Sequence, residues 1–172
     1  LNILSLLYHK NHDFYHAVEL GREALGYYRR LTEKNPQVYA AYEASLINNL
    51  AALLMEMNKT AEAEALYREA LDLYRCLTEK KPRVFADYEE NLAAMKALTI
   101  SNLAVLLGNM NRMEEAEGLL GEAWEALGAA NALRRLAANN LKYYDVDVAG
   151  SYLNLAEVLR RMGKKSVANR LL

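Results

Sequence analysis

The sequence predicts an all-α fold, a right-handed solenoid in which antiparallel helix pairs stack on one another. Three observations lead to this prediction. The 172 residues include only two prolines and eight glycines, and long stretches are rich in Ala, Leu, Glu, Lys and Arg, which favour helices. Apolar residues recur at the spacing of a helix face. The chain also repeats itself at intervals of roughly 50 residues, as proteins built from stacked helix pairs do.

The repeats align without gaps. The stretch from Ala17, AVELGREALGYYRRLTEKNPQVYAAYEASL, matches AEALYREALDLYRCLTEKKPRVFADYEENL from Ala63 at an offset of 46. The stretch from Asn48, NNLAALLMEMNKTAEAEALYREAL, matches SNLAVLLGNMNRMEEAEGLLGEAW from Ser101 at an offset of 53, and LNLAEVLRRMGKKSVANRLL from Leu153 follows at 52. We therefore predict one domain over residues 1–172, with copies at about 1–35, 36–81 and 82–140 and a partial fourth copy at 141–172.

Each copy is predicted to be a helical hairpin, and copy two illustrates the elements in order. Its first helix is expected over residues 38–57, after Pro36, because apolar residues there return every three or four positions. Asn58-Lys59-Thr60 is a short polar turn. The second helix is expected over residues 61–79, and Pro82 ends it, because the residue before a proline is biased away from helix.

The change of offset from 46 to 53 places an insertion at about residues 93–99, AAMKALT. Seven residues are close to two turns at 3.6 residues per turn. Such an insertion lengthens a helix and leaves its apolar face pointing the same way. We therefore predict a continuous helix here, with Leu92 and Ile100 on one face.

The patterns NNLAALL…NKTAEAEALYREAL and SNLAVLL…NRMEEAEGLLGEAW resemble tetratricopeptide repeats of the longer subclass, similar to those of kinesin light chains and of many bacterial arrays. The resemblance covers nearly the whole chain, with departures. The usual turn glycine remains only at Gly163, and Gly21 stands where a large side chain is usual. The resemblance implies that the first helices line a concave groove, where an asparagine series contacts the backbone of a bound peptide.

An asparagine occupies the same place in three successive first helices, at Asn49, Asn102 and Asn154. A side-chain amide carries both donors and acceptors, so it suits a peptide backbone of any sequence. The alternative is that these amides satisfy local polar groups within the repeat. The other residues expected in the groove are Ser45, Asn48, Ser101, Val105, Asn109, Glu157 and Arg161.

The resulting functional hypothesis is a non-enzymatic protein–protein interaction module that binds a peptide segment of a partner in the concave groove. The alternative is an architectural or self-associating segment of a larger protein, because the fourth copy is unfinished and a homodimer through the C-terminal end would cover its apolar surface. Copies two and three lack the lysines and arginines with which this family grips an acidic C-terminal tail, so that mode is not expected. The chain contains no glycine-rich phosphate loop, H-E-x-x-H, G-x-S-x-G or CxxC motif, so we expect no catalytic residue and no cofactor.

The histidines are confined to one stretch, at His9, His12 and His16. The alignment places them around a helix–turn–helix corner, and a zinc site would need a third or fourth ligand in a closed geometry. Asp13 is expected to cap a helix that begins at Phe14. We predict a surface corner that does not bind metal tightly.

Composition limits the partners. The net charge is −1, although residues 132–172 carry an excess of basic side chains, and a nucleic-acid partner is not expected. No apolar run approaches the roughly 20 residues that span a bilayer, so no membrane association is expected. The lone Cys76 excludes an internal disulfide and favours a reducing, cytoplasmic location.

Two aromatic features have structural predictions. Tyr39 with Tyr42, and Phe85 with Tyr88, recur at equivalent sites of adjacent copies, which favours packing between copies. Trp124 stands where the preceding copy has Leu71, so we expect it in the core.

Overall fold

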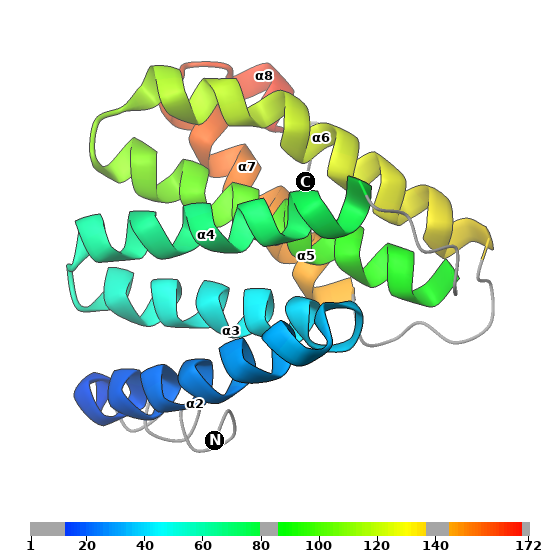
Figure 1. Ribbon diagram of the computed structural model, residues 1–172. Coiled ribbons are helices and arrows are strands. Elements are labelled where there is room, and N and C mark those ends of the chain that lie inside the picture. Colours follow the sequence, from blue (N-terminus) through cyan, green and yellow to red (C-terminus); the bar gives the residue numbers. More distant parts are fainter. Residues whose placement is uncertain (1–12, 80–85, 137–144, 170–172) are drawn as a thin grey trace. The chain divides into compact units, whose positions relative to one another are not determined.

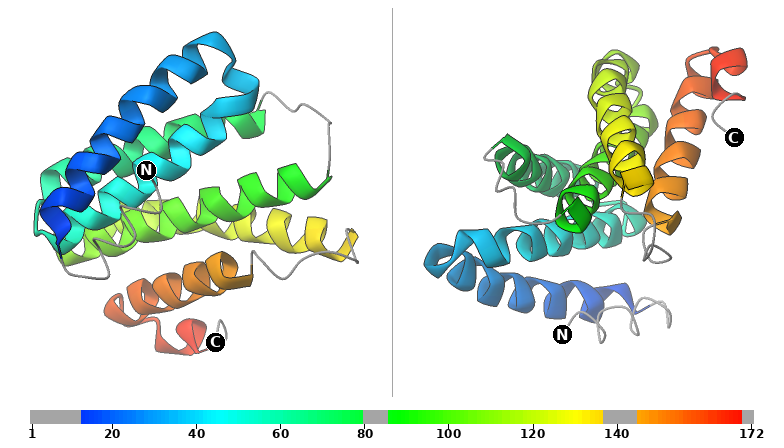
Figure 2. Two further views of the ribbon diagram at one scale, coloured as in Figure 1. Left: turned by 90° about the horizontal axis from the view of Figure 1, so that it is seen from below. Right: turned by 90° about the vertical axis from the view of Figure 1, so that its right-hand side faces the viewer.

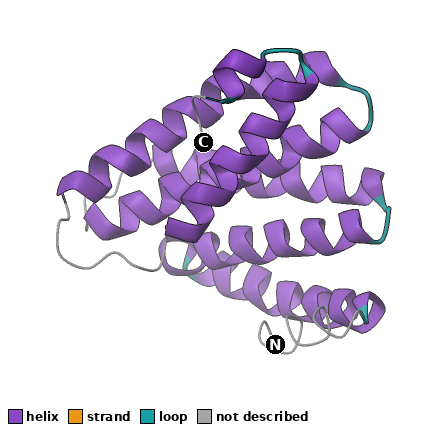
Figure 3. Ribbon diagram, turned by 180° about the vertical axis from the view of Figure 1, so that it is seen from behind, coloured by secondary structure: helices purple, strands orange, loops and turns teal. Residues whose placement is uncertain are grey.

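The structure is a computed structural model that describes residues 13–79, 86–136 and 145–169. These residues form seven helices and contain no strand (Figure 3). The all-α fold of helix pairs predicted from the sequence is confirmed. The first helix of copy one, Pro82, Phe85 and the side chain of Tyr88 lie outside the described part of the chain.

The chain forms two compact units, Leu1–Tyr74 and Arg75–Leu172, each of which is described by itself. The single domain over residues 1–172 stays a prediction. The boundary between the units falls within one helix, near the point where copy two ends.

Unit 1 contains α2 (Phe14–Lys34), α3 (Pro36–Glu56) and most of α4 (Thr60–Glu79), which continues past the unit boundary after Tyr74. Figure 1 shows α3 between α2 and α4. Both helices predicted for copy two are confirmed, with bounds that differ by one or two residues. Pro36 is the first residue of α3. A proline is favourable there because the backbone N–H that it lacks would have no acceptor within the helix.

The entry to α2 also agrees with the prediction. Asp13 is the N-cap, and its side chain accepts a hydrogen bond from the His16 backbone N–H at 3.4 Å. The same carboxylate lies 2.7 Å from His16 Nδ1. His16 is therefore engaged in helix capping at an exposed corner.

The core of unit 1 forms where α2, α3 and α4 meet. Buried side chains from the three helices pack together, and partly buried tyrosine and leucine side chains close the edge; the cluster comprises Ala24, Leu25, Leu46, Ile47, Leu50 and Ala70 with Tyr28, Leu66 and Leu73. Tyr42 stacks on Tyr28 of the preceding copy, with ring centroids 6.3 Å apart and planes inclined by 21°. The predicted packing between copies is confirmed for Tyr42, although this side chain is still 60% exposed.

Unit 2 contains α5 (Ala86–Asn109), α6 (Met113–Leu136), α7 (Asp145–Arg161) and the single turn α8 (Lys165–Ala168). Figure 2 shows α5 and α6 running side by side, with α7 packed against α5. The helix α5 runs without a break through residues 93–99, and Leu92 and Ile100 are both buried. The prediction of an in-phase helical insertion is confirmed.

One stretch of α5, Asn91–Asn109, is long and apolar enough to cross a membrane by length and composition alone, contrary to what we expected from the sequence. Within unit 2, however, 61% of this stretch is buried. A helix buried in a protein core can be as apolar as a membrane span, and the burial accounts for the apolar residues of α5.

The corner between the paired helices has the same geometry three times. Asn58, Asn111 and Gly163 have φ angles of 58°, 61° and 76°, in the left-handed region. Each donates its backbone N–H to the carbonyl three residues earlier, at 2.9, 3.1 and 3.0 Å, and the next residue donates to the carbonyl five earlier, at 2.8, 2.8 and 2.9 Å. These paired bonds satisfy the last carbonyls of the helix and reverse the chain within a few residues.

This corner generates a first prediction. Asn111→Ala should lower the free energy of unfolding by about 1 kcal/mol, because a side chain with a Cβ is strained in the left-handed region and alanine has no polar group to compensate. Asn111→Gly should cost little, because glycine adopts this conformation freely. Urea unfolding followed by circular dichroism measures both variants. Equal stability of the alanine and glycine variants would contradict the proposed role of the backbone.

A second prediction concerns Gly21, which stands where the equivalent positions carry Tyr67 and Leu120. A Cβ on Gly21 would overlap with Leu50 Cδ2, and Leu50 is only 1% exposed. Gly21→Ala should therefore destabilise unit 1 by roughly 1–3 kcal/mol, despite the higher helix propensity of alanine.

Gly26 in the same helix provides the matched control. A Cβ there would meet nothing within 4 Å. Gly26→Ala should stabilise the chain by about 0.5–1 kcal/mol, since only the backbone entropy of the unfolded chain changes. Thermal unfolding of the two variants should shift in opposite directions, and a rise for Gly21→Ala would show that the helices do not approach as closely as described.

Candidate functional site

The predicted groove residues of unit 2 form a polar stripe across α5 and α7. Asn154 Nδ2 donates a hydrogen bond of 2.8 Å to Asn102 Oδ1, and both side chains are half-buried. Two turns farther along, Arg161 donates through Nη1 to Asn109 Oδ1 and through Nε to Glu157 Oε1, the latter at 2.8 Å. We call these two interhelical pairs, Asn102–Asn154 and Asn109–Arg161, the rungs of the stripe. They are seven residues apart on each helix, so they lie on the same face.

The stripe combines donors and acceptors without a large net charge. An amide offers two N–H donors and an oxygen with two lone pairs, and the bond between the two amides uses one donor of Asn154. Val105 is half-buried between the rungs, and Glu157 neutralises Arg161. Such a surface suits main-chain amides better than it suits an acidic or basic ligand.

Unit 1 carries the corresponding positions of copy two on α3. Asn49 and Ser45 are half-buried there, as is Ala52. They belong to a unit described by itself, so a single groove shared by Asn49, Asn102 and Asn154 stays a prediction.

Two predicted groove residues do not face solvent. Asn48 is 4% exposed and Ser101 is fully buried, with its Oγ donating to the Leu98 carbonyl at 2.9 Å. The expectation that these side chains line an open groove is wrong. Each precedes an asparagine of the series by one residue, which turns it about 100° around the helix and into the packed side.

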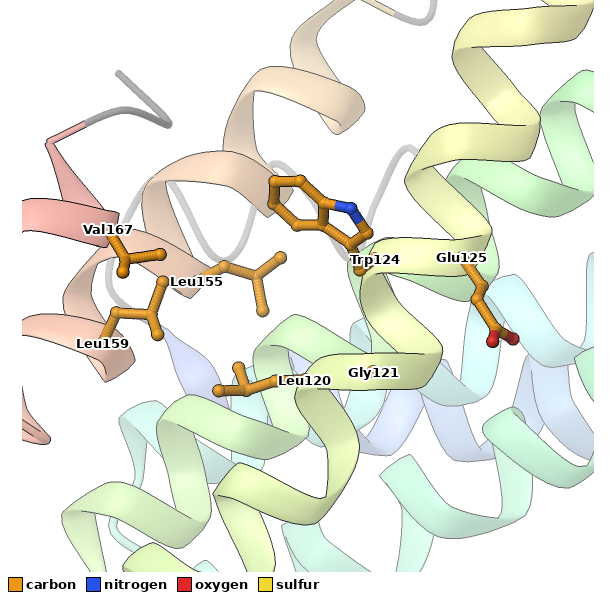
Figure 4. Close-up of a pocket in the computed structure, with 7 residues that line it drawn as sticks. All are labelled: Leu120, Gly121, Trp124, Glu125, Leu155, Leu159 and Val167. Carbon is orange, nitrogen blue, oxygen red and sulfur yellow. The ribbon is translucent and has the colours of Figure 1, made fainter. Parts of the chain in front are cut away.

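Trp124 does not lie where the sequence predicts it. The equivalent Leu71 is 2% exposed, but Trp124 is 57% exposed on α6. The prediction of a core tryptophan is wrong, because α8 accompanies α6 for one turn only and no described residue beyond it covers the indole. The close-up in Figure 4 shows the ring at the edge of an apolar groove, beside Leu155.

The histidine cluster is described only in part. His9 and His12 lie outside the described residues, and His16 pairs with Asp13 as a capping residue. The prediction that the cluster does not bind metal tightly therefore stays a prediction.

An ion cluster in unit 2 contains the carboxylate whose pKa is shifted most among the described residues. Glu122 on α6 accepts hydrogen bonds from Arg75 Nε at 3.0 Å and Arg75 Nη2 at 2.6 Å, and Lys96 Nζ lies 2.9 Å from it. The bidentate Arg75 bond, aided by Lys96, lowers the pKa of Glu122 to about 2 against the opposing effect of burial. A carboxylate held so firmly ionised is a poor proton acceptor, so we assign the cluster a structural role. Sequence reasoning missed it, since the three residues lie on three different helices.

Comparisons with known proteins match two stretches of the chain to a repeat family. The tetratricopeptide repeat family model matches residues 44–75 and 97–127. Among solved structures, the chain is similar to the crystal structure of BtubC (BKLC) from P. vanneervenii, with 16% identity over 92% of this chain and 88% of that chain and a TM-score of 0.36. A comparison with curated proteins gives no match.

The Glu122 cluster predicts a pH dependence of stability. Because its pKa is lower in the folded chain than the ordinary value of 4.5, its contribution is complete above pH 4.5 and is lost as the pH falls toward 2. Between pH 6 and pH 3, wild type should lose about 1–2 kcal/mol more unfolding free energy than Glu122→Gln does. Urea titrations at both pH values test this. The same loss in both proteins would show that the cluster does not stabilise the fold.

Proposed function

We propose that this chain holds a peptide segment of a partner protein against the first helices of its repeats, because residues 44–75 and 97–127 match the tetratricopeptide repeat model. Repeats of this family generally mediate interactions between proteins. The observation that carries the proposal is the 2.8 Å hydrogen bond between Asn154 and Asn102. It fixes two amides side by side on a half-exposed face, oriented before any ligand arrives, which lowers the entropic cost of binding.

The spacing of the stripe fits an extended peptide. The rungs at Asn102 and Asn109 are about 10 Å apart along α5, at 1.5 Å per residue. About three residues of extended chain span that distance, at roughly 3.3 Å each. The amide rung can bond to one peptide unit while the Asn109–Arg161 rung meets a carbonyl farther along. Recognition would therefore depend on the main chain more than on side chains.

The charge of the stripe determines the class of ligand. Arg161 is its only cation among the described groove residues, and Glu157 is its ion-pair partner at 2.8 Å. An acidic tail would find little net attraction there, so we propose an uncharged or mixed segment. We further propose a non-enzymatic role in the cytoplasm, in keeping with a single, exposed cysteine.

One observation favours self-association as a second candidate. Leu153 on α7 is 59% exposed, whereas Ser101, its equivalent on α5, is fully buried. A large apolar side chain is thus exposed on α7 at a position whose equivalent on α5 is buried. This makes α7 a candidate contact surface for a second copy. Sedimentation equilibrium of the parent chain and of Leu153→Ser tests this: a dimer that dissociates in the variant supports self-association through α7.

The peptide-binding proposal is tested with a partner captured from source lysate and narrowed to a synthetic peptide. Asn102→Ala and Asn154→Ala should each weaken binding roughly 2- to 12-fold, the equivalent of one hydrogen bond of about 0.5–1.5 kcal/mol. The double variant should lose less than the sum, because the two amides share a bond. Scrambling the peptide side chains that do not contact the helices should change these ratios little.

Gln37→Ala, which removes an exposed amide from unit 1, is the control and should bind as the parent does. Unfolding free energies measured in parallel separate lost binding from lost folding. Unchanged peptide affinity in both asparagine variants would refute the stripe as the binding face.

A further inference from the structure

Gly150 on α7 leaves a gap beside the amide rung of the stripe, Asn102–Asn154. The repeat offset of 52 makes this glycine the equivalent of Leu98 on α5, and each lies four residues before the asparagine of its helix. A Cβ on Gly150 would lie 3.9 Å from Leu98 Cδ1, so the leucine side chain reaches across to α7 at this level. Both residues are half-buried. The pair is therefore one more level of the stripe, about one helical turn from the amide rung.

Helix packing does not require a glycine at position 150. The 3.9 Å separation is an ordinary van der Waals contact, and among the described residues no other side chain lies within 4 Å of that Cβ. Gly21 on α2 is the contrast, because a Cβ there would overlap with Leu50. Glycine in a helix interior is less stable than alanine. Gly150 thus weakens α7 at a place where a side chain would fit, and it leaves space on the stripe.

The surface of this gap is apolar. At the two rungs, side chains of α5 and α7 bond to each other across the stripe. At the level of Leu98 there is no such pair, because Gly150 contributes no side chain. A polar group placed on Leu98 would lose hydrogen bonds to water and meet a methyl group instead. The gap therefore fits an apolar side chain.

The distance between the gap and the amide rung matches the repeat of an extended peptide. The four residues from Leu98 to Asn102 span about 6 Å along α5, at 1.5 Å per residue. Alternate side chains of an extended chain lie on the same face, and two residues span about 6.6 Å. A peptide whose main chain meets the amide rung consequently places the side chain two residues away over Leu98.

We propose that the gap at Gly150 selects the partner segment by one large apolar side chain, of the size of leucine or phenylalanine, two residues from the peptide unit on the amide rung. This selection rests on the proposed function and adds sequence specificity to it. Bonds from amides to the main chain hold many sequences alike, whereas an apolar side chain on Leu98 distinguishes between them. Gly150 is then a specificity-determining residue.

The probe is a phage library of random heptapeptides, selected in parallel on the parent chain and on the Gly150→Leu and Gly118→Leu variants. In Gly150→Leu the new side chain covers Leu98. Gly118 on α6 is the matched control, because a Cβ there meets nothing within 4 Å and the residue is outside the stripe. Neither substitution should lower the melting temperature, since leucine is a better helix former than glycine. Thermal unfolding verifies this before selection.

We expect the parent chain to enrich peptides that carry Leu, Ile, Met or Phe at one fixed position and that bind less well to Asn102→Ala. Gly118→Leu should enrich the same peptides. Gly150→Leu should lose the positional preference and keep the dependence on Asn102.

Titration calorimetry with a synthetic copy of the leading peptide, and with alanine at its apolar position, gives the magnitude. The parent should bind the apolar form roughly 5- to 10-fold more tightly, because about half of that side chain becomes buried. Gly150→Leu should bind the two forms within about 2-fold of each other.

The outcomes separate this selection from the proposed function. Peptides that depend on Asn102 but share no apolar position would overturn the role of Gly150 and leave peptide binding on the stripe standing. A preference that survives unchanged in Gly150→Leu, or that is equally lost in Gly118→Leu, would overturn the role of Gly150 as well. If the parent chain enriches no peptide that depends on Asn102, the proposed function fails, and the selection fails with it.

Discussion

The residue in left-handed conformation at the end of each described first helix is the constraint on which the other features depend. Asn58, Asn111 and Gly163 all adopt it, with the same pair of backbone hydrogen bonds. A short corner of this kind returns the chain antiparallel within a few residues and satisfies the last carbonyls of the helix. The first helix of one pair can then stack on the first helix of the next, as α7 does on α5.

This stacking brings residues at equivalent positions of successive repeats together on one surface. Residues 52 apart on α5 and α7 become neighbours, which is why Asn154 meets Asn102 and Arg161 meets Asn109. The same offsets relate the second helices, and the groove of Trp124 in unit 2 reproduces the groove of Leu25 in unit 1. Two separate surfaces therefore arise from one repeat: a polar stripe on the first helices and an apolar groove beside the second helices.

Sequence alone predicts most of the features that depend on repeat phase. Helical periodicity alone predicts the bounds of α3 and α4. The unbroken course of α5 through residues 93–99 follows from the insertion length, because seven residues are close to two whole turns. The asparagine series is predictable as a set of equivalent positions. The mutual bond of Asn102 and Asn154 is not, because it depends on the distance between two helices.

The errors have equally specific causes. Ser101 adjoins Asn102 in the sequence, but one residue along a helix is a turn of about 100°, which takes its side chain out of the groove. Trp124 aligns with a core leucine, but alignment compares residue types, whereas burial depends on the neighbouring helix, and α8 is one turn long. The Arg75–Glu122–Lys96 cluster joins side chains of three helices, a relation that no local pattern encodes.

The central claim is that equivalent positions have equivalent surroundings only where an equivalent helix covers them, so that Trp124 faces solvent whereas Leu25, packed against α4 within unit 1, is buried. Iodide quenching of the single tryptophan tests this most directly, in the folded chain and in urea. We predict that the quenching constant of the folded chain is at least half of that measured after unfolding. Emission that iodide hardly quenches until the chain unfolds would place Trp124 in the core and contradict the claim.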